Sequence, residues 1–386
     1  MRSIQFACSC VSVLASSLAL AGPFVVGDAI HVTAASGYGS NANKPAIIRI
    51  SSSPLAISPL VIDGGFTGIG AYDSFRQSVI ALRFGIAMAS VNSSGVVSGI
   101  SLAGSQDASA VAPTGDGRIY VQRATKWSYI DAANATHDLN NVANAALFKA
   151  PRVYKRAFFD MSTNAIFAGT IAASGAVLAK IPLAPDGSHV SAPVTEITLS
   201  TPGLSDPDVV GISPGPNNKL FIKIDDNGGG LGPRMILLDP VAMTQSTYAQ
   251  SNYFGIGGEI AGCYVPNLNA ALVVDSLADQ LRLFSLGASG AGTPIAGTGG
   301  ISSSGGFSGE TATTFPITAS ACPCDLNHDT LVDDSDFTIF LAAYNILDCA
   351  DPSMAAGCPS DFTHDGLVED ADFSLFVMAY NELICP

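Results

Sequence analysis

Two acidic segments of the sequence carry the same order of oxygen-bearing side chains. Segments 325–336 and 361–372 align at an offset of 36 residues, and their oxygen-bearing residues fall at positions 1, 3, 5, 9 and 12. A 12-residue loop of this kind surrounds Ca²⁺ with hard oxygen ligands and adds the backbone carbonyl of position 7. The predicted ligands of two calcium ions are therefore Asp325, Asn327, Asp329, Leu331, Asp333 and Asp336 in the first loop and Asp361, Thr363, Asp365, Leu367, Glu369 and Asp372 in the second.

Three further loop positions refine this prediction. Thr330 stands at the sharp turn where glycine is expected, which costs about 1 kcal/mol of backbone strain. Thr363 is a weaker ligand than Asn or Asp. Val332 and Val368, at position 8, should join the two loops by apolar contact. The alternative is a pair of acidic surface loops that bind no ion.

Each loop leads into a segment with the apolar spacing of a helix. Apolar residues recur at i, i+3, i+4 and i+7, which predicts one buried helical face used twice. The residues of this face are Phe337, Phe340, Leu341 and Tyr344, then Phe373, Phe376, Val377 and Tyr380.

Both loops end in Asp instead of the bidentate Glu of sensor EF-hands, and neither has an entering helix. Residues 322–386, called the tail below, thereby resemble a dockerin module, the calcium-dependent anchoring domain of bacterial cellulosomes. The resemblance implies that the tail binds a cohesin-like or cell-surface protein. In that family, partner choice depends on residues such as Asp334-Ser335 and Asp370-Ala371, and these pairs name no particular cohesin. The tail could instead serve only as an internal stabiliser.

The composition excludes some partners. The chain has 386 residues, 48% of them hydrophobic and 13% charged, with a formal net charge of −15. An acidic protein repels phosphate backbones, so nucleic acid is not expected as a partner. No segment beyond the N-terminus is long enough to span a bilayer.

The N-terminus predicts export. Arg2 precedes an apolar stretch that ends in Ala19-Leu20-Ala21, so residues 1–21 are expected to be a cleaved signal peptide. Six cysteines remain after residue 21, which favours disulfides in an oxidising compartment. The tail repeat aligns Cys322 with Cys358 and Cys349 with Cys385, but it leaves the pairing open. Cys324 has no counterpart and could reach Cys263.

Between residues 25 and 290 a unit of turn, apolar strand and second strand recurs about every 40–55 residues. First strands are expected at 29–32, 78–82, 118–121, 165–168, 219–222 and 271–274, and second strands at 47–50, 127–130, 177–181, 234–238 and 281–284. This spacing is typical of an all-β propeller with six blades, in which the N-terminal strand near 24–32 closes the ring. A β-sandwich would not account for six copies of one unit.

The last unit resembles an NHL repeat, with an apolar strand, an Asp-Ser turn and an Arg-bearing strand over 273–284, and with Gly-rich connectors at 295–299 and 306–312. The expected organisation is a signal peptide at 1–21, an all-β, six-bladed, NHL-like propeller at 22–286, a Gly/Ser/Thr-rich connector at 287–321 and a small α-helical, dockerin-like calcium-binding domain at 322–386.

The propeller offers little catalytic chemistry. The G-x-S-x-G match around Ser213 is followed by prolines and a strand, so it predicts a turn and not a nucleophile elbow. His31, His137 and His189 stand singly. Asp225-Asp226-Asn227 could supply oxygen ligands, although a solvated loop is favoured.

No catalytic residue is therefore predicted, and we expect a secreted, non-catalytic adhesion or assembly protein. The alternative is an extracellular carbohydrate-active enzyme, lactonase- or lyase-like, that its dockerin module delivers to polysaccharides.

Overall fold

The structure is a computed structural model of the whole chain. It describes residues 23–33, 47–52, 55–61, 66–83, 86–100, 108–123, 126–139, 153–170, 175–184, 186–226, 234–250, 259–275, 280–295, 312–318, 324–326, 332–355, 358, 360–362 and 366–382. The predicted signal peptide at 1–21 lies outside these residues. No helix in the described ranges is long and apolar enough to cross a membrane.

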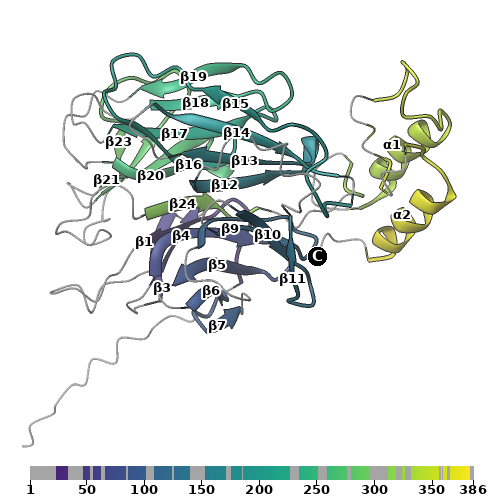
Figure 1. Cartoon of the computed structure of the whole chain (residues 1–386), viewed down its shortest axis with the longest axis horizontal. Coiled ribbons are helices and arrows are strands. Elements are labelled where there is room, and N and C mark those ends of the chain that lie inside the picture. Colours follow the sequence, from purple (N-terminus) through teal and green to yellow (C-terminus); the bar gives the residue numbers. More distant parts are fainter. Residues whose placement is uncertain are drawn as a thin grey trace, which may run out of the picture.

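Within the described residues the strands form six antiparallel sheets of four strands each. Each innermost strand contacts the innermost strands of two other sheets, which closes the sheets into a ring (Figure 1). The fold is therefore a six-bladed β-propeller, as the repeat predicted. The innermost strands are β4 (Phe66–Asp73), β8 (Ala108–Pro113), β12 (Tyr154–Asp160), β16 (Pro207–Pro214), β20 (Glu259–Val265) and β24 (Ala312–Pro316).

The expected first and second strands fall on the two middle strands of their sheets, and the strand at Ile86–Val91 is the one middle strand that the sequence did not predict. The second strands from the channel are β1 (Ala29–Thr33), β5 (Ser78–Arg83), β9 (Ile119–Arg123), β13 (Ala165–Thr170), β17 (Leu220–Asp226) and β21 (Ala270–Asp275). The third strands are β2 (Ile47–Ser52), β6 (Ile86–Val91), β10 (Lys126–Ile130), β14 (Val177–Pro182), β18 (Arg234–Leu238) and β22 (Gln280–Phe284). The outer strands are β3 (Leu55–Val61), β7 (Val97–Ile100), β11 (Thr136–Asp138), β15 (Thr195–Thr198), β19 (Gln245–Gln250) and β23 (Thr293–Pro294).

The two ends of the propeller meet in one sheet. β24 pairs antiparallel with β1, with Ala29 opposite Pro316, so the N-terminal strand takes part in closing the ring as expected. β24 lies inside the range 287–321 that the sequence suggested as a connector. The propeller therefore continues to Pro316, because β1 would otherwise expose an unpaired edge to the channel.

The innermost strands are irregular where the other strands are regular. Five of the six shift register against their neighbour near their first residues, as at a β-bulge: β4, β8, β12, β16 and β20. They also approach one another closely. A Cβ atom on Gly211 of β16 would lie 2.6 Å from the carbonyl oxygen of Gly262 in β20, so this contact requires glycine.

The tail contains two helices, α1 (Asp334–Tyr344) and α2 (Asp370–Glu382), as the apolar spacing predicted. They lie together at one side of the propeller (Figure 1, yellow). Their core is a single cluster around Phe340 and Phe376, which are each 1% exposed.

Candidate calcium-binding tail and channel cavity

The structure describes seven of the twelve predicted calcium ligands: Asp325, Asp333, Asp336, Asp361, Leu367, Glu369 and Asp372. The other five, Asn327, Asp329, Leu331, Thr363 and Asp365, lie outside the described residues. Each loop is therefore described at its beginning and its end. Those two ends carry the first and last predicted ligands.

The carboxylates at loop positions 1 and 12 are buried. Asp325 and Asp361 are 6% and 7% exposed, and Asp336 and Asp372 are fully buried. Burying a carboxylate is costly unless hydrogen bonds, a counter-charge or a metal ion compensate for the lost water. Four such groups at matched positions of two repeats are compatible with a hard cation such as Ca²⁺.

Backbone amides orient the position-12 carboxylates. Asp336 accepts hydrogen bonds from the amides of Leu326 at 2.7 Å and Asp333 at 3.0 Å. Its second bond is half of a capping box, because Asp333 also caps the first turn of α1. Asp372 accepts the equivalent bond from the amide of Glu369 at 2.9 Å. Both groups are thus held in place at the helix starts.

Position 1 of the second loop is held by the turn that follows it. Asp361 accepts a hydrogen bond from the amide of Gly366 at 2.9 Å. Gly366 is the glycine of loop position 6 and has φ +92°, a conformation that favours glycine. Its equivalent in the first loop, Thr330, lies outside the described residues.

The two repeats pack against each other through reciprocal contacts between equivalent residues. Val332 and Val368 are both fully buried in the tail core, as their position predicted. The Tyr344 hydroxyl of α1 donates to Asp370 of α2 at 2.5 Å, and the Tyr380 hydroxyl of α2 donates to Asp334 of α1. In each bond the tyrosine of one repeat binds the aspartate of the other. The two tyrosines, like the two aspartates, are 36 residues apart, which is the offset that relates the loops.

The buried face of the helices is narrower than the sequence predicted. Leu341 is 44% exposed and Phe373 is 39% exposed. Two short helices that pack mainly on each other cannot cover a wide apolar face. Together with Ile339 and Leu375, at 38% and 41%, these side chains leave apolar surface on both helices.

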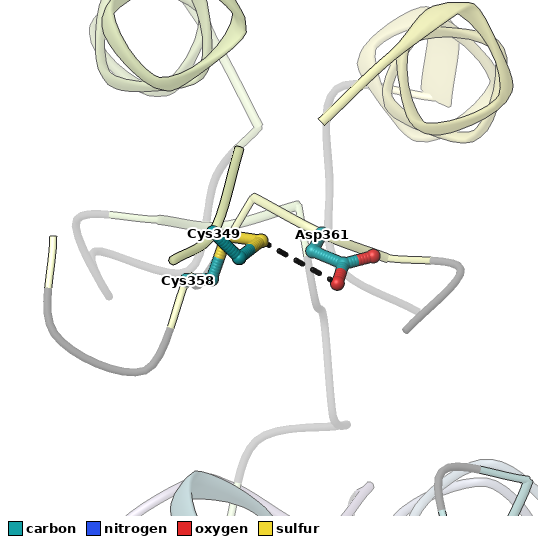
Figure 2. Close-up of side chains that lie close together, drawn as sticks. All are labelled: Cys349, Cys358 and Asp361. Atoms are coloured by element: carbon teal, nitrogen blue, oxygen red, sulfur yellow. Dashed lines mark hydrogen bonds between the residues drawn. A yellow bond between two sulfur atoms is a disulfide. The ribbon is translucent and has the colours of Figure 1, made fainter. Parts of the chain in front are cut away.

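A disulfide joins Cys349 and Cys358 between α1 and the second loop (Figure 2). The Cys349 sulfur lies 3.6 Å from the Asp361 carboxylate. These three residues are also the group of ligand-capable side chains that the described residues bring within 4.8 Å of one another. Because the sulfurs are bonded to each other, they supply no thiolate, and we assign no metal to this group.

The expected link between Cys263 and Cys324 is wrong. Both thiols are free and buried, Cys263 in the propeller and Cys324 in the tail core. Each belongs to a different apolar cluster. Burial raises the pKa of the Cys324 thiol to about 12, so it is not a reactive thiolate at neutral pH.

The weaker motifs of the propeller have structural roles. Ser213 lies in β16 ahead of a tight turn, and no helix follows it, as expected. His31 is buried against the Thr314 hydroxyl, at 3.0 Å. The solvated loop expected at 225–226 is wrong, because Asp225 and Asp226 end β17 at 9% and 8% exposure. Asp226 accepts hydrogen bonds from the amides of Ser205 and Asp206 and so anchors the preceding turn.

A cavity of about 670 Å³ extends along the channel to the tail. Five innermost strands and the tail line it, and its tail wall is formed by equivalent residues of the two repeats, Asp325-Leu326 and Asp361-Phe362. Asp325 and Asp361, the first predicted ligands of the two loops, therefore lie beside the propeller channel. This contact is not predictable from the sequence, because it joins residues far apart in the chain.

Comparison with known proteins adds no family. No protein-family model matches the chain, and no curated protein matches it. Among solved structures, the chain is similar to one in a nidogen/laminin complex, at 10% identity over 67% of this chain and 89% of that one, with a TM-score of 0.47. It is also similar to a periplasmic gluconolactonase, PpgL, of Pseudomonas aeruginosa, at 12% identity over 67% and 92%, with a TM-score of 0.43.

A third similar structure is TolB of Acinetobacter baumannii, at 10% identity over 77% of this chain and 65% of that one, with a TM-score of 0.45. Likenesses this distant carry no argument about function. The propeller is shown by the order of its own strands, and the NHL-like and dockerin-like resemblances stay predictions.

Proposed function

We propose that this is an exported calcium-binding protein whose tail attaches it to a cohesin-like or cell-surface protein, while a non-catalytic propeller binds a ligand. The observation that carries the proposal is the paired arrangement of the tail. Equivalent carboxylates are buried at both ends of each loop, and the tyrosine of each helix donates a hydrogen bond to the aspartate of the other helix. Two calcium ions held by the predicted loop residues would compensate the buried charge.

Export is supported by the predicted signal peptide and by the Cys349–Cys358 disulfide. Disulfides persist mainly in oxidising compartments outside the cytoplasm. Attachment is supported by the exposed apolar side chains Ile339 and Leu375, which are equivalent residues of α1 and α2. They lie near Asp334-Ser335 and Asp370-Ala371, the pairs that the dockerin resemblance connects with partner choice.

The enzyme alternative is echoed only by the distant likeness to a gluconolactonase, which at 12% identity shows no more than a fold. It would need several acidic, Asn or His side chains to converge on a metal in the channel. In the described part of the propeller, no three His, Cys, Asp or Glu side chains come together closely enough to hold an ion.

Titration calorimetry of the full chain with calcium tests the proposal. We expect two ions per chain, and we expect Asp325→Ala with Asp361→Ala to remove most of the binding, because each removes a charged first ligand. Asp325→Ala should also weaken binding more than Thr363→Ala. The matched control is Asp351→Ala, an exposed aspartate between the loops whose carboxylate bonds only to Ser353. Binding that survives the double substitution would contradict the ligand assignment.

Attachment is tested on immobilised full chain exposed to secreted and envelope fractions of the source organism. A partner captured in calcium should be lost in chelator and in Ile339→Ser with Leu375→Ser. If the same partner is captured both in chelator and by the Ile339→Ser, Leu375→Ser variant, docking through the helices is contradicted.

A further inference from the structure

The cavity between the propeller and the tail has the size and lining of a small-molecule site. Its volume of about 670 Å³ lies within the range of 300–1,000 Å³ usual for such sites. The aromatic residues Tyr72, Phe158, Phe159 and Phe362 are among those that line it. The hydroxyl-bearing residues Ser74, Thr114 and Ser213 line it as well.

Cationic residues line the cavity at both ends. Lys155 and Arg156 line it at the start of β12, whereas Asp160 lines it at the end of the same strand, and Lys219 lines it in the turn that follows β16. Asp160 follows Lys155 by five positions along the strand, a distance of about 16 Å at the usual rise. The cavity is thus long enough for a molecule with a charged head and an apolar body.

The fold directs Lys155 into the channel. The register of β12 against β13 shifts between Tyr154 and Arg156, so Lys155 is the extra residue of the bulge. A bulge re-aims one side chain, and bulges are frequent beside binding sites. The corresponding residues of β8, β16 and β20 are Ser109, Val210 and Ile260, which carry no charge. Among the four innermost strands that share this one-residue bulge, only β12 has a lysine there.

The Lys155 ammonium has no hydrogen bond or ion pair with another described residue, and its side chain is half-buried. Arg156 beside it donates to the carbonyl oxygens of Val210 at 3.0 Å and Lys155 at 2.8 Å. The acidic groups of the cavity lie at its other end. Asp160 there accepts bonds from Ser162 and Thr163, and Asp325 and Asp361 belong to the tail.

We propose that this cavity binds a small organic anion, with its carboxylate, sulfonate or phosphate head at Lys155 and an apolar, ring-bearing body along the aromatic walls. The inference deepens the proposed ligand binding of the propeller and does not depend on calcium. A charge-assisted hydrogen bond in a partly dry site contributes enough to change affinity tenfold or more.

The test uses the full chain and two fluorescent probes of nearly the same shape, the anion anilinonaphthalene sulfonate and uncharged phenylnaphthylamine. We expect one sulfonate per chain, bound about tenfold more weakly by Lys155→Met and nearly normally by Lys155→Arg. The uncharged probe should bind both variants like the natural chain, which shows that the cavity is intact. Lys126→Met, an exposed position of β10, is the control and should change the affinity for neither probe.

Equal affinity of the natural chain and Lys155→Met for the sulfonate would overturn the proposal, as would an equal loss of both probes. The titrations are run in calcium and in chelator beside the calorimetry. A chain that binds no calcium but still shows the Lys155 effect would contradict the proposed tail function and leave this site standing.

Discussion

The propeller and the tail both arise by repetition, but they are stabilised in different ways. The propeller buries six apolar clusters formed mainly of aliphatic strand residues, and its units share strand order rather than side chains. The tail has one small cluster of stacked rings, a disulfide and a pair of exchanged hydrogen bonds. A large ring tolerates sequence divergence because closure and burial stabilise it, whereas a small domain depends on particular side chains.

The chain carries a convenient reporter of this difference. Its single tryptophan, Trp127, is fully buried in the propeller, so its fluorescence follows the propeller alone. Hydrogen exchange of the α1 and α2 amides follows the tail. Each perturbation below can therefore be assigned to one region.

The largest expected effect is that of calcium removal. An ion that binds only the folded state stabilises it by about 2.7 kcal/mol when its concentration is a hundredfold above the dissociation constant, so two ions would contribute about 5 kcal/mol. We expect chelation to accelerate exchange in α1 and α2 and to leave the Trp127 transition unchanged. If hydrogen exchange of the α1 and α2 amides is unchanged in ion-stripped protein, the buried carboxylates need no ion.

Acidification should act on the propeller through His31. Burial lowers the pKa of His31 to about 4, from about 6.5 in the unfolded chain. Between these values the unfolded chain holds a proton that the folded chain does not, so propeller stability should fall by about 3 kcal/mol as pH drops from 6.5 to 4.

Urea unfolding followed by Trp127 fluorescence measures this loss. His31→Gln keeps a hydrogen-bonding side chain beside Thr314 but does not titrate, so its stability should depend less on pH over this window. The same slope in both proteins would assign the acid sensitivity to other groups.

The comparison also explains which parts of the fold the sequence revealed. The sequence predicts every middle strand except β6, because these strands are apolar and lie between two neighbouring blades. The innermost strands were missed because close approach and bulges select glycine, proline and small residues, as in β16, which resemble turns. β24 was missed for a different reason, because its partner β1 lies at the other end of the chain.

The tail was predicted by matching side chains one by one, which placed both helices and the buried valines correctly. That match could not give the disulfide, because the bond joins Cys349 to Cys358 across the two repeats and not between aligned cysteines. Nor could it place Lys155 beside a cavity, since only the folded ring brings five strands and the tail together.

Removing the disulfide should be the next largest effect. Cys349→Ser with Cys358→Ser opens a bond of sequence separation 9, which costs about 2–3 kcal/mol on the chain-entropy estimate. We expect faster exchange in α2 and weaker calcium binding by the second loop, because Cys358 lies three residues before Asp361. Loss of the first site alone would contradict this positioning role.

The smallest effect should come from the exchanged hydrogen bonds, and it gives the sharpest test of the tail's symmetry. The Asp370 and Asp334 carboxylates raise the pKa of Tyr344 and Tyr380 respectively, so both tyrosines are neutral donors at neutral pH. Tyr344→Phe and Tyr380→Phe each remove one bond without opening a cavity, so the two variants should accelerate tail exchange equally and less than loss of the disulfide. Because the two bonds are equivalent, faster exchange in only one of the variants would mean that the two repeats are not equally stable. One predicted calcium loop would then be held more firmly than the other.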